Sequence, residues 1–388
     1  MMYRTSKQTT TAVLFRPPCP VPPLTLCDGR RYDRLPGEEI TLIELLAPML
    51  TLDVLDDISL SEKPWGQIAL AAGLLLPNYH FPLTRTEITV EQDHHLQLDE
   101  PVIFAMNHTD RYNYWPFQYR LWRSYGQYTT TWVKGKYYNS RPLREFMIKT
   151  NNLAVPSRGY LITADAADVL GHPPDDNTYR LIRDAIDAGI DDTRQLREQA
   201  AEQGVLSQIV PLLDTPRDML GMRFEPHRHN YLEAMHRLFY EMMEKFVELN
   251  ERALDLDLNI LVFPEGTRSI RLQDGKPGLA QMALRMKTPV IPVGCNGSDR
   301  VYPGDAPVAR GGKIVYRIGR PLMPDGELAP YQIDERFTPF TDDAEDRYGD
   351  VFQSMTELLM DRINGLLDAR HRRSDDAASS NGGSRRFL

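Results

Sequence analysis

The chain has 388 residues, of which 41% are hydrophobic, so it can bury a substantial core in one large domain or two smaller ones. Its formal net charge of −9 argues against a general nucleic-acid binder, although a local basic face stays open. Cys19, Cys27 and Cys295 are too scattered for a disulfide framework or a paired zinc site, so we expect reduced thiols and no metal.

The N-terminal part divides into an arm and a helical region. Residues 1–30 are polar and then proline-rich, which predicts a flexible arm without a secretory signal. Leucine-rich patterns predict helices over residues 31–85. The apolar run at 68–77 is half as long as a membrane-spanning helix. We expect this run to be a buried or interfacial helix end, which lets the chain lie on a membrane but not cross it.

From residue 86 the sequence changes to short β-branched runs that end in turn or polar residues. Seven such runs, with helical segments between several of them, predict an α/β fold. We expect a mixed, largely parallel sheet of about seven strands covered by helices, with a helical N-terminal region and a long helical insertion. The predicted strands are 86–92, 101–106, 128–135, 151–157, 258–264, 288–294 and 312–319.

A long helical insertion is predicted over residues 161–257. Near its end, apolar residues recur at spacings of three and four, which predicts a helix that either packs on the sheet or lines an apolar groove. The insertion as a whole is either a membrane-facing lid or a packing element. The main domain is expected to cover 86–330, followed by a helical segment at 331–370 and a disordered tail at 371–388. The recurring apolar residues are Leu232, Met235, Phe239, Met242, Phe246 and Leu249.

Three segments place reactive polar groups directly after predicted strands: 107–110, 157–159 and 263–269. In open α/β sheets ligands bind beyond the carboxyl ends of the strands, so we expect these segments to converge. In the last one, "FPEGTRS", a glycine permits a tight turn and an arginine offers a planar fork for phosphate. The glutamate either accepts from a substrate hydroxyl or holds that arginine. An ordinary turn with an exposed ion pair is the alternative.

His108 has two possible roles and two candidate hydrogen-bond partners. Asn107, Thr109 and Asp110 are residue types that begin helices, so one interpretation is that His108 lies at the start of a helix. The other interpretation is that His108 is a general base. Asp110 lies about 200° around a helix from His108 and is expected to be a cap. Asn113, five residues after the histidine, is the other candidate partner. The motifs GxSxG, GxxxxGK[ST] and HExxH are absent from the sequence, which leaves acyl transfer by a histidine base open.

The order of these segments resembles a known family. "NHTDRYN", "LAVPSRG", "VFPEGTRS" and "PVIPVG" resemble the four conserved blocks of the glycerol-3-phosphate and 1-acylglycerol-3-phosphate acyltransferases. The third block is reproduced letter for letter, the fourth matches well, the first matches in part, and the second matches chiefly through its arginine. The resemblance covers roughly residues 86–322, apart from most of the insertion, and implies that 86–330 is an acyltransferase domain.

The resemblance implies roles for individual residues. His108 resembles the general base, Asn113 stands in its partner's place, and Glu265 belongs to the third block; these three are the expected catalytic residues. Arg158 and Arg268 resemble the family's phosphate contacts, and a basic rim with Lys134 is either a site for phosphates or anionic lipid or a solvated face. Pro292 either supports the acyl donor or is structural. The residues expected to bind substrate are Asn107, Lys134, Arg158, Gly266, Thr267, Arg268 and Pro292.

The chain departs from the family in the first and second blocks. The family has an aspartate five residues after the histidine, where this chain has Asn113. An aspartate orients the imidazole and stabilises its cation, whereas an amide orients the ring without supplying charge. In the second block, Ser157 stands where an acidic residue is common.

The leading prediction is an acyltransferase that uses His108 as general base. It moves a fatty acyl group from acyl-CoA or acyl-carrier protein to glycerol-3-phosphate, lysophosphatidate or a related lipid alcohol. The alternatives are a weak or inactive member that binds lipid or acyl carrier, and a thioester hydrolase. We expect no cofactor beyond the acyl-donor co-substrate, no nucleic-acid partner, and a cytoplasmic location with peripheral contact to the membrane.

Overall fold

The computed structural model describes residues 49–80, 84–96, 99–190 and 192–373. The predicted arm at 1–30 lies outside these residues, as does the part of the predicted tail at 371–388 that begins at residue 374, and both stay predictions. Residues 371–373 of that tail are described, and His371 is buried, so the ordered chain extends beyond the predicted start of the tail. Cys295 is a buried free thiol.

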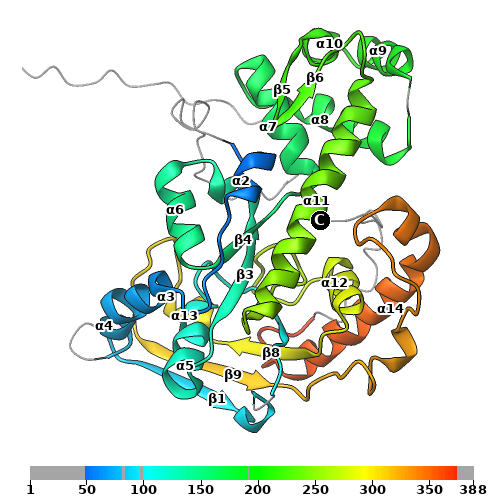
Figure 1. Cartoon of the computed structure of the whole chain (residues 1–388). Helices are drawn as coiled ribbons and strands as arrows, with labels where there is room; N and C mark the ends of the chain where they lie inside the picture. The colour runs from blue at the N-terminus through cyan, green and yellow to red at the C-terminus, as the bar shows by residue number, and fades with distance from the viewer. Residues whose placement is uncertain (1–48, 81–83, 97–98, 191, 374–388) are drawn as a thin grey trace, which may run out of the picture. The chain divides into compact units, whose positions relative to one another are not determined.

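Seven strands of the described chain form one sheet, in the order β1-β9-β8-β2-β7-β3-β4. β8, β2, β7, β3 and β4 run parallel, whereas β9 is antiparallel to β8 and carries β1 parallel to itself. Each strand falls on a predicted run, so the mixed, largely parallel sheet is confirmed (Figure 1). The strands are β1 (Thr86–Glu91), β2 (Ile103–Met106), β3 (Thr129–Lys134), β4 (Asn152–Val155), β7 (Asn259–Val262), β8 (Val290–Asn296) and β9 (Gly312–Ile318).

β2 shows how the sheet buries both of its faces. Ile103 and Ala105 belong to one hydrophobic cluster, and Phe104 and Met106 to a second cluster on the opposite face. This division follows from the alternation of side chains along a strand. Burying each large side chain stabilises the fold by roughly 1.5–3 kcal/mol.

Helices cover both faces. The first cluster is completed by α2 (Leu52–Asp56), α6 (Arg141–Lys149), α12 (Gly278–Met286), α14 (Asp342–Gly365) and the helices of the insertion. The second is completed by η1 (Ala71–Leu75), α4 (Leu76–Tyr79), α5 (Trp115–Tyr125) and α13 (Ser298–Val301). Shorter elements are α3 (Trp65–Leu70), η2 (Asp93–Leu96), η3 (Gly135–Tyr138) and η4 (Ala329–Tyr331).

The predicted insertion is helical, with one small hairpin. Its last helix packs on the sheet: α11 contacts β4 and β7, and Trp132 Nε1 donates to Asn250 Oδ1 at 2.7 Å. The six apolar residues with helical spacing are all buried, which confirms the packing interpretation of this helix. The elements are α7 (Arg158–Leu170), α8 (Asp176–Asp187), α9 (Thr193–Glu202), α10 (Leu206–Asp214), β5 (Arg217–Met219), β6 (Met222–Phe224) and α11 (Tyr231–Asp255).

Of the helical region predicted over 31–85, the described part contains helices from α2 to α4, whereas residues 31–48 and 81–83 lie outside the described residues. None of the helices in the described ranges combines the length and apolarity needed to cross a membrane. At the other end of the chain, α14 begins at Thr341, whose side chain accepts from the Ala344 N–H, and acidic residues fill its first turn.

Candidate active site

The ends of three strands bring the first and third sequence blocks together. β2 lies between β8 and β7, and all three run in the same direction, so the segments after them meet at one edge of the sheet. Glu265 Oε1 accepts from the His108 N–H at 2.8 Å. The Ser269 N–H donates to the His108 carbonyl, also at 2.8 Å. The backbone of the histidine is therefore held from both sides by the segment 263–269.

Asn113 is the partner of the His108 ring. Nδ1 of the histidine lies 3.1 Å from Asn113 Oδ1. Asn113 Nδ2 donates to the Asn107 carbonyl at 2.8 Å, and because a carbonyl only accepts, the amide cannot be reversed. Oδ1 therefore accepts from Nδ1–H, which leaves the lone pair on Nε2. Within the described part of the chain, Nε2 makes no hydrogen bond, so it can accept a proton from a ligand.

Asp110 stabilises the turn that follows His108. Its Oδ1 accepts from the Tyr112 N–H and its Oδ2 from the Thr109 hydroxyl, both at 2.9 Å. Such local bonds from an aspartate to the following backbone are typical of turns. Burial raises the pKa of the Asp110 carboxyl above its usual value. Asp110 therefore stabilises a turn and caps no helix, since α5 begins after Tyr114, whose side chain makes no capping bond.

Aromatic rings line one side of the imidazole. The Phe263 ring stacks on the His108 ring, with centroids 3.9 Å apart and planes 17° from parallel. The Tyr114 ring meets Phe263 edge-on, with centroids 6.1 Å apart. Both arrangements are favourable for aromatic pairs, and together they fix the plane in which the histidine lies.

The surroundings keep the imidazole neutral. Burial lowers the pKa of His108 to about 3, against the opposing effect of the hydrogen bond to Asn113. The positive charges of Arg268 and Lys134 lower this pKa further. At neutral pH the ring is therefore uncharged and able to accept a proton, although its basicity is low.

Glu265 acts on the backbone. Its buried carboxylate accepts from the His108 N–H and, through Oε2, from the Gln273 N–H at 2.9 Å. Burial raises the pKa of Glu265 to about 7, while these two bonds oppose the increase. The sequence predicts that this residue contacts substrate or holds Arg268. In the structure both of its oxygens are bound to backbone N–H groups, so the carboxylate positions the histidine.

The rest of the third block forms a turn that presents its arginine. Gly266 has a φ of 67°, in the left-handed region that favours glycine, and its N–H donates to the Phe263 carbonyl at 3.0 Å. Thr267 is exposed and Arg268 is partly exposed. Among the described residues Arg268 makes no hydrogen bond or ion pair, which leaves its guanidinium available. Lys134 is exposed at the carboxyl end of β3.

Arg158 lies in a different set of contacts. It is 8% exposed at the start of α7, and its guanidinium pairs with Asp187 at 3.2 Å and Asp342 at 3.1 Å. It also lies over the Phe239 ring, 4.8 Å from the centroid. No contact between Arg158 and His108 occurs in the described ranges. The structure thus joins α7 to α8, α11 and α14 through this arginine.

Asn107 and Pro292, two further residues predicted to bind substrate, form bonds with the strands of the sheet instead. Asn107 Nδ2 donates to the Cys295 carbonyl at 3.0 Å, and its Oδ1 accepts from the Cys295 N–H at 2.7 Å. Pro292 is buried in β8 opposite Ala105, and its carbonyl accepts from the Gly319 N–H at 2.8 Å. In this geometry both residues support the strands beside the histidine.

Sequence reasoning missed three aromatic contributors. Phe263 and Tyr114 stand inside or beside the quoted motifs, so an aromatic residue next to each polar block was a usable signal. Tyr316 donates its hydroxyl to the Asn113 carbonyl at 2.6 Å, from 203 residues away. No local pattern predicts a contact over that separation.

Part of the chain matches a known protein family. Residues 228–296 match the model of the acyltransferase family, and this range includes Glu265 to Arg268 and β8. Among solved structures, the chain is similar to the 1-acyl-sn-glycerophosphate (LPA) acyltransferase PlsC from Thermotoga maritima, with 13% identity, 81% of each chain covered and a TM-score of 0.35. That likeness is too distant to carry an argument. No curated protein matches the chain.

Proposed function

We propose that this acyltransferase moves a fatty acyl group from a thioester, acyl-CoA or acyl-carrier protein, to a hydroxyl of a phosphorylated glycerolipid. Glycerol-3-phosphate and lysophosphatidate are the acceptors we favour. The observation that carries the proposal is the neutral, oriented imidazole of His108, whose Nε2 has no hydrogen bond within the described chain and which lies within electrostatic reach of two cations.

The proposed reaction needs one proton transfer through the histidine. Nε2 of His108 takes the proton from the acceptor hydroxyl while that oxygen attacks the carbonyl carbon of the thioester. A C–O bond forms and the C–S bond breaks. The imidazolium then gives its proton to the departing thiolate, which leaves as a thiol. Asn113 keeps the ring oriented throughout but adds no charge to stabilise the cation.

Arg268 and Lys134 support recognition of a phosphorylated acceptor. A guanidinium binds phosphate with a planar pair of N–H groups, and an ammonium adds a compact charge. Both cations lower the pKa of His108, so a phosphate that neutralises them also makes the base stronger. Binding of the correct acceptor would then raise the basicity of the group that deprotonates it.

We also propose peripheral contact with the cytoplasmic face of a membrane, through the segment 64–79. This segment contains no charged residue, and Trp65 at its start is 76% exposed. Tryptophan is enriched where a protein meets the interfacial region of a bilayer. The contact would bring a lipid acceptor to the enzyme without a spanning helix.

Acyl transfer by the purified full-length protein tests the proposed reaction. A labelled acyl chain is offered on acyl-CoA with glycerol-3-phosphate, with lysophosphatidate, and with monoacylglycerol as the matched acceptor without phosphate. We expect an ester of a phosphorylated acceptor to form, with kcat/KM at least about tenfold above that for monoacylglycerol, because charge-assisted hydrogen bonds to phosphate are lost. Release of free fatty acid without ester would indicate a hydrolase. Absence of both products would indicate a binding protein, and either result contradicts the proposal.

A further inference from the structure

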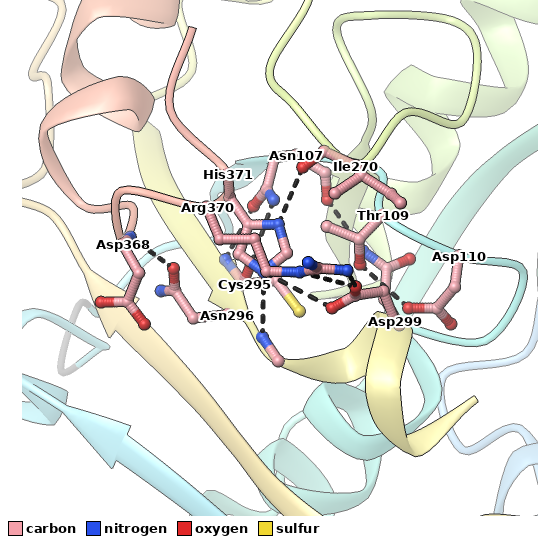
Figure 2. Close-up of polar contacts among 12 residues, drawn as sticks. Asn107, Thr109, Asp110, Ile270, Cys295, Asn296, Asp299, Asp368, Arg370 and His371 are labelled. Carbon is pink, nitrogen blue, oxygen red and sulfur yellow. Dashed lines mark hydrogen bonds and ion pairs between the residues drawn. The ribbon is translucent and has the colours of Figure 1, made fainter. Parts of the chain in front are cut away.

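The chain beyond α14 passes the loop that follows β7, and Figure 2 shows His371 of this segment next to Ile270 of that loop. His371 in this segment is 2% exposed. Its Nδ1 lies 2.8 Å from the Ile270 carbonyl, and because a carbonyl only accepts, Nδ1 carries a proton. The Leu272 N–H donates to the His371 carbonyl, also at 2.8 Å. The histidine is thereby bonded to the loop that follows β7.

The other ring nitrogen of His371 faces the loop that follows β8. Nε2 lies 3.3 Å from the Gly297 nitrogen and 3.5 Å from Asp299 Oδ1. Nε2 accepts from the Gly297 N–H, and the Asp299 carboxylate lies beside it. Asp299 is itself fixed by two bonds from Arg370, at 3.1 and 2.7 Å. One side chain therefore bridges the loops after β7 and β8.

The bridged loops are the two that flank the base. β2, which leads to His108, lies between β7 and β8 in the sheet. In the loop after β7, residues 269–273 are bound on two sides. The Ser269 N–H donates to the His108 carbonyl, and the Gln273 N–H donates to Glu265. Ile270 and Leu272, which are bonded to His371, lie between these two residues. A movement of His371 is thus passed to the base through a run of only five residues.

The crossing segment is firmly seated. The Asp368 N–H donates to Asn296 Oδ1 at 2.7 Å, and Arg317 Nη1 donates to the Leu366 carbonyl at 3.0 Å. Gly294 in β8 has no room for a side chain, because a Cβ there would lie 2.6 Å from Leu366 Cβ. The segment is therefore packed directly on the strand next to β2, and His371 has a fixed support.

We propose that His371 is a positioning residue for His108, which holds both flanking loops and thereby sets the direction of the imidazole. Its kinetic consequence rests on the proposed function, whereas its geometric consequence can be measured without turnover. Nothing in the motifs around His108 contains this residue, which stands 263 positions later in the sequence.

Two isosteric substitutions separate the two contacts. In His371→Asn the amide nitrogen takes the place of Nδ1, so the bond to Ile270 stays and the contact with Gly297 is lost. In His371→Gln the amide reaches the place of Nε2, so the contact with Gly297 stays and the bond to Ile270 is lost. His227→Asn, at a side chain that is 69% exposed, is the control.

Amide hydrogen exchange and the ring ¹⁵N signals of His108 are measured on the full chain, with His108→Gln used to assign the signals. We expect His371→Gln to speed exchange in the 269–273 run about tenfold or more, and His371→Asn to do so at Gly297. His371→Gln should also shift the His108 ring signals and lower kcat about 10- to 100-fold at nearly unchanged acceptor KM.

Ring signals and exchange in 269–273 that stay as in wild type in His371→Gln would overturn the inference, even if the melting temperature falls. If wild type transfers no acyl group, the proposed function fails on its own, and the ring signals and exchange still decide the role of His371.

Discussion

Asn113 stands where the acyltransferases that this sequence resembles have an aspartate, and its surroundings suit an amide. Its Nδ2 donates to the Asn107 carbonyl, and its Oδ1 accepts from Nδ1 of His108. The backbone carbonyl of Asn113 accepts from the Tyr316 hydroxyl. With a carboxylate at this position, an oxygen would replace Nδ2 and face the Asn107 carbonyl, so two hydrogen-bond acceptors would meet without a proton between them. The His108 ring is therefore oriented by a hydrogen bond to a neutral amide, with no ionic partner at this position.

Replacement of Asn113 by aspartate should raise the pKa of His108 and destabilise the fold. The new charge favours the imidazolium, but the bond to Asn107 is lost, and an unsatisfied buried group costs about 1–3 kcal/mol. Urea unfolding at pH 8 measures the cost, and an NMR titration of the ring measures the pKa. The exposed Asn177→Asp is the control. An unfolding midpoint equal to that of wild type would contradict a site built for an amide.

Glu265 should give the free energy of unfolding a pH dependence of defined sign. Burial raises its folded-state pKa from the usual 4.5 to about 7, so over this range the folded protein keeps a proton that the unfolded chain releases. Wild type should therefore lose about 3 kcal/mol of stability relative to Glu265→Gln as the pH rises from 4.5 to 7. His108 is present in both proteins and cancels in the comparison.

Urea unfolding of both proteins at pH 4.5 and 7.5 measures this difference. If the difference in the free energy of unfolding between the two proteins stays constant over that range, the Glu265 carboxyl ionises normally. That result would contradict a buried Glu265 that holds the backbone of His108.

Among the elements, α3 is anchored to the sheet in a way that turns its tryptophan outward. Gln67 Nε2 donates to the carbonyls of Thr129 and Thr150 at 2.6 and 2.8 Å. Trp65, two residues earlier, has no such burial and is left at the surface. An uncharged helix fixed on one side and apolar on the other is suited to a lipid surface.

We expect Trp65→Glu to weaken binding to vesicles of anionic phospholipid by about tenfold or more, since the apolar area transferred to lipid is lost. Flotation of the full-length protein measures the bound fraction. Leu206→Glu, which changes an exposed apolar side chain on α10, is the matched control and should bind as wild type does. Equal loss in both variants, or in neither, would exclude α3 as the contact.

At the scale of the whole molecule, Arg158 ties the insertion to the C-terminal helix. Its side chain is nearly buried, and its carboxylate partners lie on α8 and α14. Removing one member of a buried pair leaves uncompensated charge, so Arg158→Ala should cost about 3 kcal/mol of stability. Arg183→Ala, at an exposed pair, should cost little.

Urea unfolding and the KM for the acceptor are measured for both of these arginine variants. Together they separate a role of Arg158 in stabilising the fold from a role in binding substrate. A large rise in KM for Arg158→Ala, with an unchanged free energy of unfolding, would instead assign this arginine to the acceptor's phosphate.

Much of this architecture could be predicted from the sequence because it depends on local pattern. The β-branched runs ended by turn residues located all seven strands, and the spacing of apolar residues located the packing face of α11. The position of Asn113, five residues after His108, was also enough to identify the partner of the ring. These features are decided within a few residues along the chain.

The remaining features depend on contacts between distant segments. The clamp by Glu265 requires the backbone N–H of a residue 157 positions earlier, which no local pattern records. His371 stands in a charged stretch whose composition predicts disorder, yet its ring is buried by two loops from elsewhere in the chain. Arg158 matches the family's phosphate contact by position, and its two carboxylate partners become visible only in the fold.

The central claim is that His108, oriented by Asn113, is the base for acyl transfer. The most direct measurement is kcat/KM for transfer from acyl-CoA to a phosphorylated acceptor by wild type and His108→Ala, with the melting temperature recorded for both. We expect a loss of at least about 100-fold, the usual size of a general-base contribution, at nearly unchanged melting temperature. Transfer by the folded His108→Ala protein at the wild-type rate would contradict it.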